Sequence, residues 1–155
     1  MMKRFFTLTR DTAGAVTIEL ALMAPILGAM LIGLVDLSTA YSDKLRLEQV
    51  AQRTIEKVQQ RGFTTSQETD LEDEAEAEAG TGSAADLTYW LECTDTDGNV
   101  TTAVYTAGCP SGHGYARYVQ LDITKDISPI ITARFGGSNT NGTITVRGIA
   151  GIRIQ

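Results

Sequence analysis

One uninterrupted apolar run near the N-terminus constrains this chain more than any other feature of its sequence. Residues 15–35 read AVTIELALMAPILGAMLIGLV, and Glu19 is the one charged residue among them. At about 1.5 Å per helical residue, the run extends roughly 31 Å, which matches the hydrocarbon thickness of a bilayer. It therefore predicts a transmembrane helix. The alternative, a buried core helix, would rarely be this long and this apolar.

The charges on either side of the run predict its orientation. Lys3, Arg4 and Arg10 precede it, whereas the first basic residues after it are Lys44 and Arg46. The positive-inside rule then places the N-terminus in the cytoplasm and everything after Val35 outside, as in a single-pass membrane protein. A secretory signal peptide is disfavoured. The apolar region of a signal peptide is only about 7–15 residues long and ends at a small-residue cleavage site, whereas the run here is longer and continues into an amphipathic helix.

Glu19 lies inside the apolar run, where a carboxylate costs about 2.5–3.5 kcal/mol on insertion scales. Cleavage between Gly14 and Ala15 would create an α-amine four residues away, on the same helical face. In a stack of subunits, that amine could instead meet the Glu19 of a neighbour, and such an ion pair in a low dielectric selects one register. The alternative is a plain membrane anchor that carries one glutamate.

Small residues within the run are spaced for helix packing. Ala24 with Gly28, and Ala29 with Gly33, form two small-xxx-small pairs that let helix backbones approach closely. Pro25 removes one helical hydrogen bond and allows a kink. The alternative is that glycine and proline are simply common in membrane helices.

These residues carry a resemblance to a known family. Residues 14–20 (GAVTIEL) resemble the processing motif of type IV prepilins, and residues 10–52 resemble the TadE/TadG-like proteins of tight-adherence (Flp) pilus systems, including the acidic Asp36 and Tyr41 after the span. The resemblance implies that residues 1–14 are a leader removed after Gly14 by a membrane prepilin peptidase. It also implies a minor pilin or pseudopilin, with other pilin subunits and the inner-membrane pilus assembly platform as partners.

Beyond the membrane, the helix is expected to continue to Arg61, with Gly62 as its C-cap. Apolar residues recur there mostly at three- and four-residue spacing: Leu37, Tyr41, Leu45, Leu47, Val50, Ala51, Ile55 and Val58. Residues 62–82 are expected to be an acidic linker, because charge runs usually form solvated or flexible segments. A short helix that starts with a Thr65/Glu68 capping box and ends at Gly80 is the alternative.

Residues 83–155 change to a period of two and predict an extracytoplasmic β domain of four antiparallel strands. Asp97-Gly98 and Asn141-Gly142 predict turns between strands. A sheet of this size is marginal alone and would gain from packing on the helix over residues 45–58. The expected fold class is therefore α+β, a pilin-like long helix packed on a small antiparallel sheet.

Cys93 and Cys109 are expected to form a disulfide, because the predicted topology places both in an oxidising compartment. Residues 95–99 (DTDGN) hint at a calcium loop but lack the glutamate that an EF-hand requires, so a turn is the better interpretation. His113 lies between glycines without an acid spaced to orient it, and is interpreted as a loop residue.

The composition narrows the possible functions. The formal charge of −6 argues against nucleic-acid binding, which needs a basic face. No cofactor, no metal site and no enzymatic activity are expected. The leading hypothesis is a structural subunit of a pilus that serves adhesion and surface attachment. The alternative is a signal-anchored periplasmic binding module, whose acidic segment or disulfide domain would contact a ligand.

Overall fold

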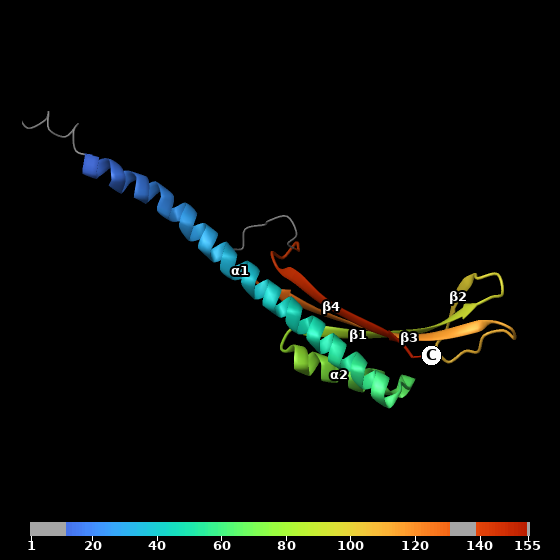
Figure 1. The fold of residues 1–155 in the computed structure, drawn as a ribbon. Helices are drawn as coiled ribbons and strands as arrows, with labels where there is room; N and C mark the ends of the chain where they lie inside the picture. The colour runs from blue at the N-terminus through green and yellow to red at the C-terminus, as the bar shows by residue number, and fades with distance from the viewer. Residues whose placement is uncertain (1–11, 131–138, 155) are drawn as a thin grey trace, which may run out of the picture.

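A computed structural model describes residues 12–130 and 139–154, with residues 12–15 described by their backbone alone. The long helix α1 (Thr12–Arg61) extends far beyond the sheet, which packs against the C-terminal half of the helix (Figure 1). The chain continues through a 3-10 turn η2 (Thr65–Gln67), α2 (Glu68–Ala79), β1 (Ser83–Thr94), β2 (Val100–Ala103), β3 (Gly114–Ile127) and β4 (Ile144–Arg153). The expected α+β arrangement is confirmed.

Helix α1 is continuous from the candidate membrane span into the folded domain. Its 50 residues correspond to about 75 Å. It ends at Arg61 because Gly62 adopts a φ of +77°, a left-handed conformation that favours glycine and terminates helices. Pro25 lies inside the helix without ending it. The predicted C-terminal end of the helix is therefore confirmed.

The two halves of α1 have different surroundings. Large apolar side chains between Val16 and Val35 are 36% to 67% exposed. In the second half, one stripe packs against the sheet and is buried, and it consists of Leu47, Val50, Ala51, Thr54, Ile55 and Val58. Leu37, Tyr41 and Leu45 were expected in this stripe but are exposed, so that part of the prediction is wrong. The sheet does reach this part of the helix, since Ala40 packs on the core and Asp43 pairs with Lys125 of β3. At about 100° per residue, however, Tyr41 and Leu45 lie roughly 120–160° around the helix from Leu47, away from the sheet.

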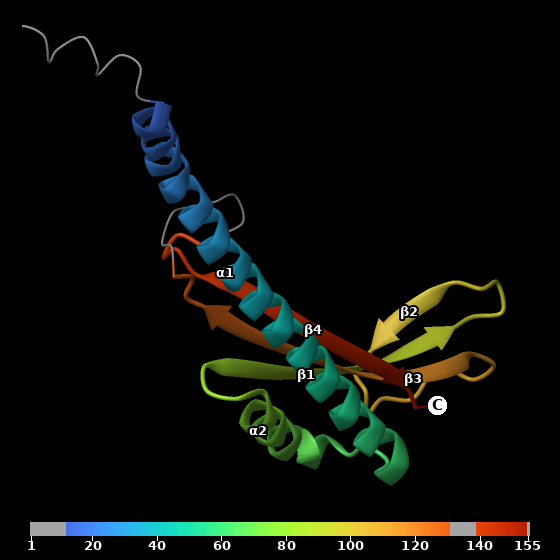
Figure 2. The same ribbon diagram turned by 60° about the vertical axis from the view of Figure 1, so that its left-hand side comes forward.

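The four strands form one antiparallel sheet in the order β2-β1-β3-β4. Both helices lie on the same side of it (Figure 2). The predicted alternation is confirmed: the side chains that face the helices are buried, and include Leu87, Leu91, Val119, Leu121, Ile123 and Val146. On the opposite face, Trp90 and Tyr118 stand directly across from each other with their ring centroids 5.4 Å apart.

The acidic segment differs from the linker that its charge predicted. Residues 68–79 form α2, and its alanines Ala75 and Ala79 are fully buried in the core. The helical alternative is the one that the structure contains, and it ends next to Gly80 as expected. The capping box, however, is formed by Thr64 and Gln67 and not by Thr65 and Glu68. The charge run is ordered because its alanines provide an apolar face.

The two predicted turns are present. Gly98 has a φ of +88° between β1 and β2, and Gly142 has a φ of +78° just before β4. The Asp95 carboxylate organises the first turn by accepting hydrogen bonds from the backbone N–H groups of Asp97 and Asn99, at 2.9 and 2.8 Å. Residues 95–99 are therefore a turn, as interpreted from the sequence.

Candidate assembly surface

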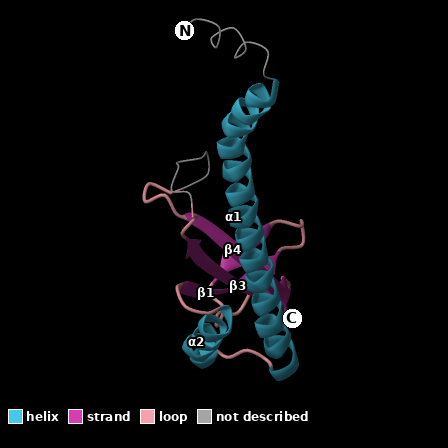
Figure 3. Cartoon of the chain, turned by 90° about the vertical axis from the view of Figure 1, so that its left-hand side faces the viewer, coloured by secondary structure: helices cyan, strands magenta, loops and turns pink. Residues whose placement is uncertain are grey.

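The N-terminal half of α1 forms the largest exposed apolar surface of the described chain. Figure 3 shows this part of the helix standing clear of the strands and of α2. It is the one helix among the described residues that is long and apolar enough to cross a membrane, and its most apolar window has no buried residue. A surface of this size on a soluble protein would be covered, so it is a candidate for lipid or helix contact.

Glu19 is an exposed side chain on this surface, and its environment within the chain consists of apolar residues of the same helix. Gly14 and Ala15 precede it in the first turns of α1, and the structure describes their backbone alone. The helix therefore holds the Gly14–Ala15 peptide bond and Glu19 about one turn apart. None of the ion pairs among the described residues involves Glu19.

The small residues form two separate packing positions around the helix. At about 100° per residue, Ala24 and Gly28 lie roughly 140–180° from Glu19, whereas Ala29 and Gly33 lie roughly 40–80° from it on the other side. A Cβ placed on Gly28 or Gly33 would meet nothing within 4 Å. The helix thus presents two shallow positions, one near Glu19 and one opposite, where neighbouring helices could approach closely.

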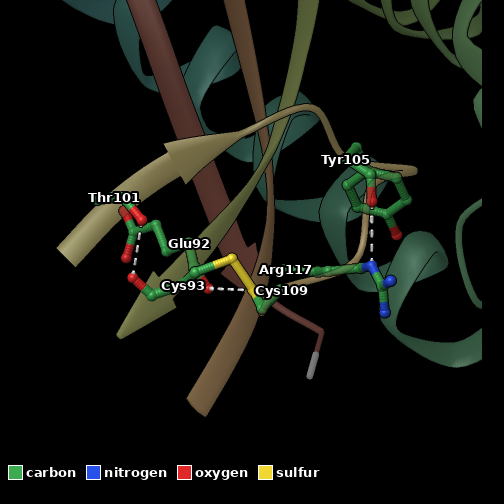
Figure 4. The surroundings of a disulfide bond; sticks show 6 residues. All are labelled: Glu92, Cys93, Thr101, Tyr105, Cys109 and Arg117. Carbon is green, nitrogen blue, oxygen red and sulfur yellow. Dashed lines mark hydrogen bonds between the residues drawn. A yellow bond between two sulfur atoms is a disulfide. The ribbon is translucent and has the colours of Figure 1, made fainter. Parts of the chain in front are cut away.

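The disulfide lies at the other end of the molecule. Cys93 of β1 and Cys109 of the loop after β2 are bonded, with their Cα atoms 5.6 Å apart (Figure 4), which confirms the predicted pairing. Nearby, the Arg117 Nε donates a hydrogen bond of 3.1 Å to the carbonyl oxygen of Tyr105. The Arg117 guanidinium also lies 5.7 Å from the centroid of the Tyr105 ring. These contacts hold the loop between β2 and β3 against the sheet.

An aromatic cluster closes the core beneath the C-terminal end of α1. Phe63, Tyr89 and Tyr105 lie with ring centroids 5.1 to 5.5 Å apart, two of the three pairs edge-to-face. The geometry is the one that aromatic quadrupoles favour. Phe63 follows the C-cap glycine directly, so the end of α1 is fixed to the sheet.

Three glutamates of α2 accept hydrogen bonds from β1, and these contacts were not predicted from the sequence. The Leu87 N–H donates to Glu72 at 2.7 Å and the Ala85 N–H donates to Glu76 at 2.9 Å. The Tyr89 hydroxyl donates to Glu68 at 2.7 Å. This hydrogen bond, together with burial and the negative charges of Glu68 and Glu72, raises the pKa of Tyr89. The spacing of four residues between these acids was the available signal, since it places them on one helical face.

These contacts close the free edge of the sheet. Strand β2 pairs with β1 over Leu91–Thr94, so among the described residues no strand lies beside the edge of β1 before that point. An open strand edge is a template for unwanted pairing with another chain. The carboxylates of α2 occupy two of its backbone donors. The acidic residues are thus part of the fold and are not a free ligand-binding tail.

Two acidic residues of α1 connect the helix to the end of the sheet that lies nearest the apolar run. The Ile130 N–H donates a hydrogen bond of 2.9 Å to the Asp36 carboxylate, and Lys125 of β3 lies 3.4 Å from Asp43. The Lys125 and Asp43 side chains are about one-fifth exposed. We call Asp36, Asp43, Lys125 and Ile130 the neck contacts. Asp36 is one of the residues that carry the family resemblance, but its partner was not predictable from spacing.

The remaining polar candidates are His113 and the carboxylates of the β1–β2 turn. Among the described residues, no group of three or more His, Cys, Asp or Glu side chains is placed to hold a metal ion. His113 lies in the loop before β3, as interpreted from the sequence, with its Nδ1 buried. The hydrogen bonds from the Asn99 side chain and backbone hold the pKa of Asp95 below its ordinary value, with smaller contributions from the Asp97 N–H and from His113.

The fold and this surface define a class: a protein with one candidate membrane-spanning helix that continues into a small disulfide-bonded α+β domain. Residues 14–55 match the family model described as TadE-like protein. The match begins at Gly14 and ends within α1, so it confirms the resemblance for the helix and leaves the sheet outside it. Neither the curated proteins nor the solved structures contain a match to this chain.

Proposed function

We propose that this protein is a minor pilin or pseudopilin of a tight-adherence (Flp-type) pilus system. Its role is structural and involves no catalytic step. In this proposal α1 anchors the precursor in the inner membrane, with the N-terminus in the cytoplasm and the sheet in the periplasm. A prepilin peptidase cleaves after Gly14, and the mature subunit enters or initiates the filament through the assembly platform.

The observation that carries the proposal is the TadE-like match of residues 14–55 on a helix whose first half is uncovered. A helix with this much exposed apolar surface is suited first to lipid and then to neighbouring helices, as transfer from a membrane into a filament requires. The small pairs Ala24/Gly28 and Ala29/Gly33 support close packing on two sides of the helix. The sheet domain, fixed to the other half, would remain outside the helical bundle.

Glu19 supplies the specificity of assembly in this proposal. Its carboxylate is costly in lipid, by about 2.5–3.5 kcal/mol, and a plain anchor gains nothing from it. The α-amine of Ala15 exists only after cleavage, so the charge that would neutralise the Glu19 of a neighbouring subunit appears only in processed subunits. An unpaired buried charge is strongly destabilising, which makes the pair selective for one register.

The alternative of a periplasmic binding module has less support. That alternative expected the acidic segment or the disulfide domain to contact a ligand. Glu68, Glu72 and Glu76 are instead engaged by β1 within the chain. The two hypotheses can be distinguished by testing whether the chain is cleaved and whether it enters filaments, because a binding module requires neither step.

Processing is tested with the Gly14→Val variant, expressed with the cognate peptidase. We expect the wild-type chain to lose its first 14 residues and the variant to keep them, as judged by intact mass and N-terminal sequencing. Leu22→Val, a conservative change in the same helix, is the matched control and should be processed normally. Wild-type protein that begins at Met1 after purification would contradict the proposal.

Assembly is tested with the Glu19→Gln variant, which keeps the shape of the side chain and removes its charge. We expect normal membrane insertion and cleavage but loss of the variant from sheared filaments. Glu48→Gln, on the same helix outside the candidate span, is the control and should assemble. Filaments that contain the Glu19→Gln chain at the wild-type level would rule out the proposed register pair.

A further inference from the structure

Three exposed apolar side chains surround the point where α1 leaves the apolar run. Leu37 is 67% exposed, Tyr41 is 61% exposed, and Ile130 of the β3–β4 connection is 67% exposed. Leu37 and Tyr41 belong to the helix, whereas Ile130 is distant from both in sequence. We call these three residues the neck patch. Exposed apolar side chains that gather at one level of a molecule are candidates for a contact surface.

The neck contacts fix the position of Ile130 along the axis of α1. Asp36 directly follows Val35, the last residue of the apolar run, and its carboxylate accepts the Ile130 N–H at 2.9 Å. The ion pair between Asp43 and Lys125 holds the end of β3 two helical turns further along. With both contacts in place, the start of the β3–β4 connection lies beside the first turn of α1 after the apolar run.

This position coincides with the interfacial layer of a bilayer. The headgroup regions add about 5–7 Å on each side of the hydrocarbon core. At about 1.5 Å per residue, the Cα of Leu37 lies roughly 3 Å beyond Val35, inside this layer, and the Cα of Tyr41 lies roughly 9 Å beyond it, just outside the layer. Because helical side chains point back toward the N-terminus, the Tyr41 ring extends toward the interfacial layer, where tyrosine is enriched in membrane proteins. Ile130, bonded to Asp36, is within the same layer.

We propose that the neck patch is a membrane-docking surface, in which Ile130 inserts into the interfacial layer of the periplasmic leaflet and orients the sheet domain against the bilayer. The proposal rests on the proposed function in one respect, that α1 spans the membrane over residues 15–35. The occupant is lipid because the patch is continuous with the candidate span and at the depth of the headgroups. A docked domain would have a fixed tilt before assembly and would have to leave the lipid to enter a filament.

The test places a fluorescent nitrobenzoxadiazole label on single introduced cysteines in the full chain. Cys93 and Cys109 are bonded to each other, so a thiol-specific label reacts with the introduced cysteine. The variants are Ile130→Cys in the patch, Leu27→Cys within the span, and Val104→Cys at the far end of the sheet. Leu27 is 55% exposed and Val104 is 72% exposed, so both match Ile130 in accessibility.

Each labelled protein is reconstituted into vesicles of phosphatidylethanolamine and phosphatidylglycerol, with lipids brominated near the headgroup or near the chain ends. We expect the label at position 130 to shift to shorter wavelength and to be quenched most by shallow bromine. The label at position 27 should be quenched most by deep bromine, and the label at position 104 should not be quenched. Adding Asp36→Ala to the Ile130→Cys variant should reduce the quenching at position 130.

The outcomes separate this inference from the proposed function. Quenching at position 27 without quenching at position 130 overturns the docking surface and leaves the membrane anchor intact. Absence of quenching at position 27 removes the anchor and the inference with it. A wavelength shift at position 130 that depends on the protein-to-lipid ratio and not on bromine would show that a second copy of the chain covers the patch, which also overturns lipid docking.

Discussion

At Gly148, the backbone of β4 lies directly against the backbone of α1. A Cβ at this position would lie 2.5 Å from the Leu47 carbonyl carbon and 2.6 Å from the Glu48 nitrogen, both backbone atoms. Those atoms cannot move without displacing the helix from the sheet. The sequence shows Gly148 on the inward parity of β4, but only the packed structure shows that the missing side chain is what lets the helix approach.

We expect the Gly148→Ala variant to be destabilised by about 1–3 kcal/mol, the usual cost of overpacking a core. The measurement is the denaturant midpoint in detergent, followed by the fluorescence of Trp90, the one tryptophan of the chain. Gly151→Ala is the matched control in the same strand, because a Cβ there would meet its nearest atom, the Val119 carbonyl oxygen, at 3.4 Å. Equal midpoints for the two variants would contradict the prediction.

Asp95 provides a pH-dependent contribution to the β1–β2 turn. Hydrogen bonds from Asn99 lower the pKa of the Asp95 carboxyl in the folded state. Its contribution to stability is therefore fully present above the pKa of an unfolded aspartate, about 3.9, and is lost as the pH falls through the folded-state pKa. We expect a carbon NMR titration of Asp95 to show a midpoint below that of the same residue in an unfolded peptide.

The Asn99→Ala variant tests the cause of that shift. Removing the Asn99 side chain deletes the hydrogen bond of 2.9 Å to the carboxylate, which is the largest cause of the lowered pKa. The pKa of Asp95 should therefore rise toward its ordinary value while the backbone hydrogen bonds remain. An unchanged Asp95 titration in this variant would show that the side chain of Asn99 does not set it.

At the scale of elements, α2 packs along the edge of β1 that β2 leaves unpaired. The carboxylates on its charged face accept hydrogen bonds from N–H groups of β1 that no strand pairs with, and its alanines are buried in the core. The Arg46 guanidinium of α1 donates to the Glu78 carbonyl oxygen at 2.8 Å, next to the C-terminal end of α2. A cation near the C-terminal end of a helix interacts favourably with the negative end of the helix dipole. The segment therefore has order that its charge density alone did not indicate.

The Glu72→Ala variant should expose the edge of β1. We expect faster amide hydrogen exchange at Leu87, because a hydrogen bond from this N–H to a charged acceptor contributes about 1.5–3 kcal/mol. Asp73→Ala, an exposed neighbour on the same helix, is the control and should leave that exchange rate unchanged. Unchanged protection of Leu87 in the Glu72→Ala variant would mean that the carboxylate does not secure the edge.

At the scale of the whole molecule, the chain consists of a free apolar helix joined to a self-contained core. Every buried apolar side chain of the described residues lies at Leu47 or later in the chain. The core is formed by the second half of α1, α2 and the sheet. The disulfide adds a constraint on the loop at the far end from the span.

A chain of residues 36–155 should therefore fold without the apolar run. We expect it to be soluble, to form the Cys93–Cys109 disulfide, and to have a denaturant midpoint close to that of the full chain in detergent. Size-exclusion chromatography, circular dichroism and thiol titration measure these properties. A truncated chain that is unfolded or aggregated would show that residues before Asp36 contribute to the core.

The sequence alone predicted the elements with strong periodic patterns. The apolar run, the end of α1 before Gly62, the alternation of the strands and the pairing of Cys93 with Cys109 all follow from local chemistry or from the compartment. The family resemblance of residues 10–52, for which the family model matches residues 14–55, was likewise carried by local motif residues. Glu19 and its proposed partner remain a prediction, because the pairing would occur between chains.

Only the tertiary structure decided which surfaces meet. Periodicity predicted one apolar stripe on α1 from Leu37 to Val58, but the residues that face the sheet before Leu47 are Ala40 and Asp43, while Tyr41 and Leu45 lie on another side of the helix and are exposed. Charge density suggested a linker at residues 62–82, but α2 is ordered because its alanines are buried in the core and its carboxylates accept hydrogen bonds from β1. The contact of Ile130 with Asp36 joins residues far apart in the chain, and no local pattern encodes such a distance.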